Sequence, residues 1–174
     1  MTEPNWLTRA RHFIGMAEMP GVKNSPELMA VLDWADGKQD GKTLGAQNDD
    51  EAYCAKGVCA VLELEQIRST RSPAARSFQK WGQTLAGPAL GAVVVFWRKS
   101  VDGPFGHVGF VAGRDSSGNV MCLGFNQSDS INIRAFPMAR VLSFRWPPGL
   151  AKPKTGFATL PLLKSDGTVS TNEA

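Results

Sequence analysis

A cysteine, a histidine and an asparagine stand in this sequence where a thiol nucleophile would need them. Cys54 opens a predicted helix, His107 opens a predicted strand, and Asn126 lies near the end of the next strand. A thiolate nucleophile requires a proton acceptor within hydrogen-bond reach and a further polar group that orients this base. The three residues therefore predict nucleophilic catalysis by cysteine.

The choice of base is narrow because the chain has only two histidines. His12 lies in the first predicted helix, outside its apolar stripe, and is interpreted as an ordinary histidine. His107 remains as the base.

The third member follows from the register of a predicted hairpin. If the turn 116–119 joins two antiparallel strands, residues whose numbers sum to about 233 or 234 face each other. His107 then lies opposite Asn126 or Gln127. Asn126 is favoured if one residue of bulge is allowed, with Gln127 or Asp129 as alternatives.

The position of Cys54 at a helix N-terminus predicts a lowered thiol pKa, because unpaired amides and the helix dipole favour the thiolate. A carboxylate beside the thiol would raise this pKa, so the preceding acids, Asp50 among them, are interpreted as helix caps. Cys59 and Cys122 fall in apolar segments and are expected in the core. A zinc site is weakly supported, because Cys54 and Cys59 lack the usual ligand spacing.

The composition describes one globular domain. The chain has 174 residues, of which 43% are hydrophobic and 20% charged, with a net charge of +3. No apolar run approaches the roughly 20 residues that span a bilayer, so no membrane insertion is expected. The net charge comes without a basic cluster, which excludes a typical nucleic-acid surface. Three cysteines argue against a disulfide framework, and no cofactor or metal is implied.

Helical patterns come first along the chain and strand patterns follow. Helices are predicted at 6–19, at 25–37, from Cys54 to about Leu64, and in a short stretch within 72–82. A meander of strands is predicted at 93–97, 107–112, 120–126, 131–136 and 141–146. This order predicts an α+β fold, with N-terminal helices packed on a C-terminal antiparallel sheet over residues 1–148. Residues 149–174 are expected to form a tail that drapes over the domain and is partly disordered.

Several short motifs in this order resemble the NlpC-type and CHAP-type cysteine peptidases and amidases that cut bacterial cell-wall peptides, in particular the short phage and prophage branch. The resemblance covers residues 5–148. Its most specific parts are the Gly106-His107-Val108-Gly109 and Asn126-Gln127-Ser128 segments, supported by Tyr53-Cys54-Ala55, Ser69-Thr70-Arg71-Ser72, Trp81-Gly82 and Arg145-Trp146-Pro147.

The resemblance implies a papain-like fold with Cys54 as nucleophile, His107 as base and Asn126 as orienting residue. Tyr53, Asp50 and Gln127 are expected at the substrate cleft. The family usually has Trp before the cysteine and an aromatic residue three positions after it, where this chain has Tyr53 and Gly57. Gly57 either leaves room under the nucleophile or indicates a reshaped pocket or weakened activity.

The expected activity is hydrolysis of an amide bond in the peptidoglycan stem peptide or at its junction with muramic acid. Two alternatives are a wall-binding or tail-assembly module that has lost the chemistry, and an effector amidase delivered into a competitor's periplasm, which a bound immunity protein would identify. A monomer is expected. Without a recognisable signal peptide, the chain is expected to be made in a bacterial cytoplasm and to reach the periplasmic wall through a holin, a tail or a secretion machine.

Overall fold

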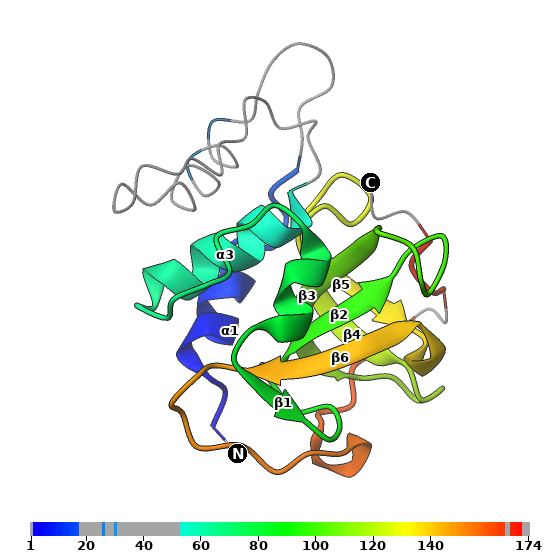
Figure 1. The fold of residues 1–174 in the computed structure, drawn as a ribbon. Helices are drawn as coiled ribbons and strands as arrows, with labels where there is room; N and C mark the ends of the chain where they lie inside the picture. Colours follow the sequence, from blue (N-terminus) through cyan, green and yellow to red (C-terminus); the bar gives the residue numbers. More distant parts are fainter. Residues whose placement is uncertain (1, 18–25, 27–29, 31–52, 166–167, 172–174) are drawn as a thin grey trace.

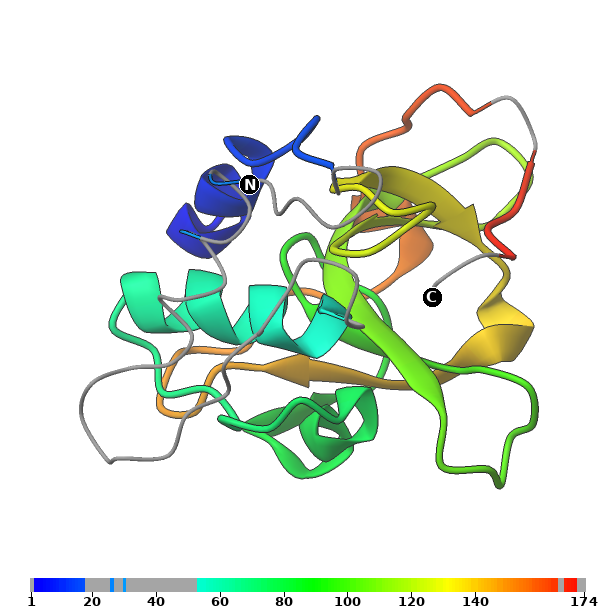
Figure 2. The ribbon, with the colours of Figure 1, turned by 90° about the horizontal axis from the view of Figure 1, so that it is seen from above.

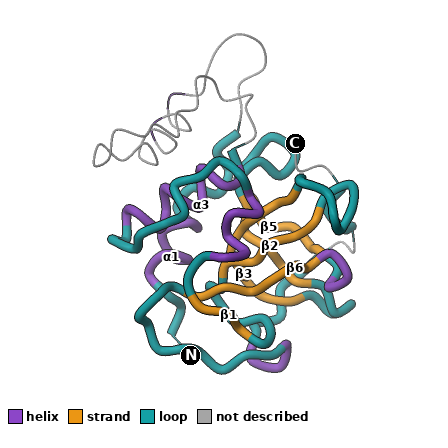
Figure 3. Tube along the Cα trace, viewed as in Figure 1, coloured by secondary structure: helices purple, strands orange, loops and turns teal. Residues whose placement is uncertain are grey.

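An antiparallel sheet with helices on one side forms the body of the protein in the computed structural model, which describes residues 2–17, 26, 30, 53–165 and 168–171 (Figure 1). Strands and helices are separated along the described chain as the sequence predicts, and the fold is α+β (Figure 3). The helices are α1 (Asn5–Arg11) and α3 (Cys54–Leu64), with 3-10 turns η1 (Ala75–Lys80), η2 (Met138–Arg140) and η3 (Phe157–Thr159). The strands are β1 (Gln83–Leu85), β2 (Val93–Trp97), β3 (Gly106–Arg114), β4 (Val120–Gly124), β5 (Asn132–Phe136) and β6 (Val141–Trp146).

The strand order in the described sheet is β1-β6-β2-β3-β4-β5, and all neighbours are antiparallel. The predicted meander is confirmed from β2 to β5. It is wrong for the last strand, because β6 returns to the free edge of β2 and the unpredicted β1 pairs outside it. The first four residues of β2 are all buried, as expected for a central strand that has a neighbour along each edge.

The hairpin of β3 and β4 has the predicted register. Paired residue numbers sum to 233 up to Val111 and to 234 beyond a bulge at that point. The side chain of Asp115 accepts the backbone N–H groups of Ser117 and Asn119 at 2.9 and 2.8 Å and so closes the turn. This local bonding sets the register that later brings the site residues together.

Helix α3 packs on β3 and β4, and α1 lies beside α3 (Figures 1 and 2). Gly57 allows α3 to approach Phe125 closely, since a Cβ atom at position 57 would lie 2.2 Å from two ring carbons of Phe125. The room that this glycine leaves is therefore filled by the fully buried Phe125 ring, which comes from the segment after β4.

The first helix is shorter than predicted. α1 ends at Arg11, and Gly15 follows with φ of 96°. The chain then pairs with the segment after β4, where the N–H of Gly15 donates to Ile131 O at 2.9 Å and Ile131 N–H donates to Met16 O at 2.8 Å. A left-handed glycine and this pairing replace the last turns expected for 6–19. The second predicted helix, 25–37, falls almost entirely outside the described residues.

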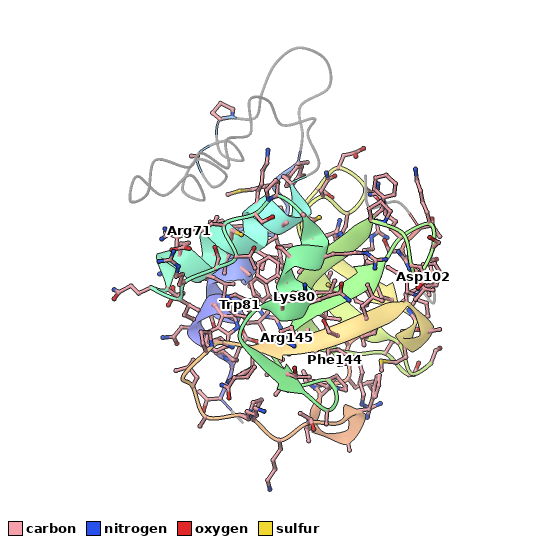
Figure 4. All side chains as sticks on the ribbon, viewed as in Figure 1. Arg71, Lys80, Trp81, Asp102, Phe144 and Arg145 are labelled. Atoms are coloured by element: carbon pink, nitrogen blue, oxygen red, sulfur yellow. The ribbon has the colours of Figure 1, made fainter. Side chains whose placement is uncertain are left out.

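The predicted helix within 72–82 is a 3-10 turn, η1, that is fixed by Arg145 on β6. The Arg145 guanidinium donates to Trp81 O at 2.6 Å and to Gly82 O at 3.0 Å. Figure 4 labels Trp81 and Arg145, which lie close together. The Trp81-Gly82 and Arg145-Trp146 motifs are thus two halves of one contact. Among the described residues no helix combines the length and apolar character that crossing a membrane requires.

The described part of the tail packs on the domain. Leu160 is buried, Leu162 forms a bridge with Arg114 of β3, and Val169 forms one with Ala135 of β5. The described part of the tail therefore contacts β3 and β5. Residues 172–174, where disorder was expected, lie outside the described part of the chain.

We predict that Gly57→Ala lowers the free energy of unfolding by about 1–3 kcal/mol, as measured by urea denaturation. The Cβ atom would overlap the Phe125 ring, and this overlap outweighs the gain of about 1 kcal/mol in helix propensity.

The matched control is Gly87→Ala, whose added atom meets its nearest neighbour at 3.8 Å. It should change stability by less than about 0.5 kcal/mol. In a Phe125→Leu background the penalty at Gly57 should shrink. An equal penalty in both backgrounds would show that Phe125 is not its cause.

Candidate active site

Four chain segments meet at one end of the central strands. Because neighbouring strands are antiparallel, β2 ends, β3 begins and β4 ends at this same end of the sheet. The N-terminus of α3 reaches the same place, where the Cys54 sulfur takes a hydrogen bond from the backbone N–H of Val108. Cys54 therefore lies directly beside the residue that follows His107.

Cys54 begins α3 with its side chain only 7% exposed. Burial raises the pKa of its thiol above the ordinary value of 9.0. The backbone N–H groups of Val108, Ala55 and Cys54 and the charge of Arg98 act in the opposite direction but do not outweigh the burial. The expectation of a lowered pKa is wrong because loss of water costs the thiolate more than the helix N-terminus returns.

His107 is held in plane by aromatic rings. It is 1% exposed, and its ring lies parallel to Phe136 within 3° at a centroid distance of 5.4 Å. Phe96, its register partner on β2, stacks from 6.3 Å. The rings fix the plane of the imidazole, and polar contacts at its edge fix the rotation.

The Nε2 atom of His107 lies 3.1 Å from Oε1 of Gln127, a fully buried side chain. Gln127 is oriented in turn by Asn132: its Nε2 donates to Asn132 O at 2.8 Å, while Asn132 Nδ2 donates to Gln127 O at 2.7 Å. A backbone carbonyl only accepts, so both amides have one possible orientation. Oε1 of Gln127 therefore faces His107, and Nε2 of His107 must be the donor.

This hydrogen bond decides which nitrogen can act as a base. With the proton of the neutral ring on Nε2, the lone pair is on Nδ1, a buried atom on the opposite edge of the imidazole. Gly124 makes the arrangement possible, since a Cβ atom there would lie 2.5 Å from Gln127 Oε1 and 2.7 Å from His107 Nε2.

The structure places Gln127, rather than Asn126, at His107. Asn126 is 1% exposed and has a φ of 60°, and neither polar atom of its amide has a hydrogen-bond partner within the described chain. β4 ends at Gly124, so the register that would carry Asn126 to His107 stops short of it. The left-handed turn at Asn126 instead brings in the next residue, the one named as an alternative from sequence.

Of the other two residues predicted at the substrate cleft, the structure describes only Tyr53. Tyr53 is fully buried and is the N-cap of α3, where its carbonyl accepts the Gly57 N–H at 2.8 Å. No side-chain hydrogen bond from Tyr53 caps this helix, and the acids predicted as caps lie outside the described residues. Asp50 lies outside the described residues. Cys59 and Cys122 are fully buried, which confirms their expected place in the core.

Sequence reasoning missed Asn132, Arg98 and the aromatic pair around His107. Asn132 had one available signal, since it is a polar residue at the start of an otherwise apolar strand pattern. Within the described ranges, no group of three or more histidine, cysteine or acidic side chains is close enough to hold a metal ion.

We predict that ¹⁵N NMR of the neutral His107 ring finds the proton on Nε2 in the wild type, because Oε1 of Gln127 can only accept. Gln127→Met removes the acceptor at similar volume and should produce a mixture of tautomers. Asn126→Ala is the matched comparison and should leave the Nε2–H form in place. A tautomer shift in Asn126→Ala but not in Gln127→Met would reverse the assignment.

Comparison with models of protein families, with curated proteins and with solved structures finds no match for this chain. A functional assignment therefore depends on the geometry of Cys54, His107 and Gln127.

Proposed function

We propose that this protein is a thiol hydrolase that cleaves an amide bond of the peptidoglycan stem peptide. The observation that carries the proposal is the buried His107–Gln127 hydrogen bond, which leaves Nδ1 as the basic nitrogen of a residue whose chain neighbour, Val108, contacts Cys54. An orienting group on one nitrogen of a histidine and a nucleophile near the other is the arrangement that acyl transfer uses.

The proposed reaction begins with transfer of the Cys54 proton to Nδ1 of His107. The thiolate attacks the scissile carbonyl, and the amide of Cys54 stabilises the oxyanion. The protonated His107 then gives its proton to the leaving amine, and the C–N bond breaks to leave a thioester. Water adds to the thioester with His107 as base, which releases the acid and restores the thiol. Gln127 keeps the ring in one orientation throughout.

The wall peptide as substrate rests on the motif resemblance. The structure gives a physical reason for two of those motifs, because Gly106-His107-Val108-Gly109 and Asn126-Gln127-Ser128 contribute the two partners of the central hydrogen bond. It also accounts for one departure, since Phe125 provides an aromatic ring against Gly57.

We predict that Cys54→Ala abolishes release of new amine termini from purified cell walls, measured by mass spectrometry of the soluble muropeptides. Gln127→Ala should lower the rate by less than the loss in Cys54→Ala, because it removes orientation and leaves the nucleophile. Cys59→Ala, a buried cysteine on the same helix, is the control and should retain activity. Wall cleavage by Cys54→Ala at the wild-type rate would refute the proposal.

A second candidate is an inert wall-binding or tail module of the same fold. The burial of Cys54 and its raised pKa favour this candidate, because a protonated thiol is a poor nucleophile. The two candidates differ in whether His107 can generate the thiolate.

We predict two phases in the pH dependence of Cys54 alkylation by iodoacetamide, followed by peptide mass spectrometry between about pH 6 and 10. In His107→Ala, labelling should rise only above 9.0, because burial keeps the thiol protonated beyond its ordinary pKa. The wild type should add a phase below about pH 8 in which His107 accepts the proton. Cys59 and Cys122 provide slow internal references. Identical profiles for wild type and His107→Ala would favour the inert module.

A further inference from the structure

Arg98 is the first residue after β2, at the end of the central strands where the candidate site lies. Phe96 and His107 are register partners whose rings stack, so Phe96 faces the side of the sheet that carries the histidine. Arg98 stands two residues further along, and side chains at this spacing leave a strand on the same face. Its backbone N–H still donates across to Phe105 O at 3.2 Å, so the strand geometry extends to Arg98.

The loop that begins at Arg98 is held in place by a different arginine. Arg76 of η1 donates from Nε to Phe105 O at 2.9 Å and from Nη2 to Ser100 O and Val101 O at 3.1 and 3.0 Å. These bonds fix the backbone from both ends of the loop. None of these bonds uses the Arg98 guanidinium.

Arg98 is partly buried and has no counter-charge among the residues that the structure describes. It has neither an ion pair nor a side-chain hydrogen bond to any residue in the described part of the chain, in contrast to Arg71, which is paired with Glu63. Asp102 of the same loop is exposed and forms no ion pair with it in this part of the chain; Figure 4 shows Asp102 at the rim of the molecule. The Arg98 charge is nevertheless close enough to Cys54 to favour the thiolate.

We propose that Arg98 binds a carboxylate of the substrate next to the scissile amide and so determines substrate specificity. A guanidinium matches a carboxylate through two parallel hydrogen bonds. The charge also offsets the repulsion between this carboxylate and the Cys54 thiolate, which a site without a cation would have to bear. The inference rests on the proposed function, and it names the chemical feature by which the substrate is recognised.

The experiment uses soluble stem tetrapeptides in which each carboxylate is either free or converted to the carboxamide. Binding is measured by calorimetry in the Cys54→Ala background, where no turnover occurs. One free carboxylate should strengthen binding about 10- to 100-fold over its carboxamide. Arg98→Gln should remove this preference and leave affinity for the carboxamide within about threefold, and Arg98→Lys should retain part of the preference.

Lys99→Gln removes the same charge one residue away and is the matched control, which should keep the full preference. Equal weakening of all peptides by Arg98→Gln, or a preserved preference, would overturn the role of Arg98. Binding of no peptide at all would overturn it as well. Kinetics of the wild type separates the two proposals: cleavage without carboxylate preference contradicts only the role of Arg98, whereas selective binding without cleavage contradicts only the hydrolase.

Discussion

The hydrogen bond from His107 Nε2–H to Gln127 Oε1 is the interaction on which the candidate site depends. It lies in the core, where an amide facing the wrong way would leave a buried donor and acceptor unpaired. The reciprocal bonds with Asn132 exclude that orientation. A glycine at 124 supplies the space, so a strand, the loop after it and the next strand together define one tautomer of one histidine.

Burial fixes the geometry of the site and also disfavours the Cys54 thiolate. The enclosure that orients His107 also removes water from Cys54 and raises its pKa. Burial favours the neutral thiol, so the proposed hydrolase requires His107 to accept the Cys54 proton. The amide of Val108 and the charge of Arg98 oppose the desolvation without cancelling it. In the proposed mechanism the Cys54 thiolate therefore depends on His107 more than on the helix on which the cysteine lies.

Much of the fold was predictable because its signals are local. The apolar run of β2 and the bounds of β6 are confirmed as predicted, and the turn before Val120 set the hairpin register correctly. Cys54 at the start of a helix and His107 in a strand followed from the same patterns. Local patterns failed where a distant segment competes for the backbone, as at Gly15 and Met16, which pair with Ile131 instead of continuing α1.

The sequence by itself determined the α+β class, the helix that carries Cys54 and the strand that carries His107, because hydrophobic periodicity and turn residues act over a few positions. Only the tertiary structure decided between Asn126 and Gln127, since a left-handed residue beyond the end of β4 shifts the register by one. It also decided the direction of the Cys54 pKa, because desolvation depends on everything packed around the sulfur. Likewise, only the tertiary structure explains the glycine at position 57, because Phe125 is distant in sequence but lies directly against Gly57 in space.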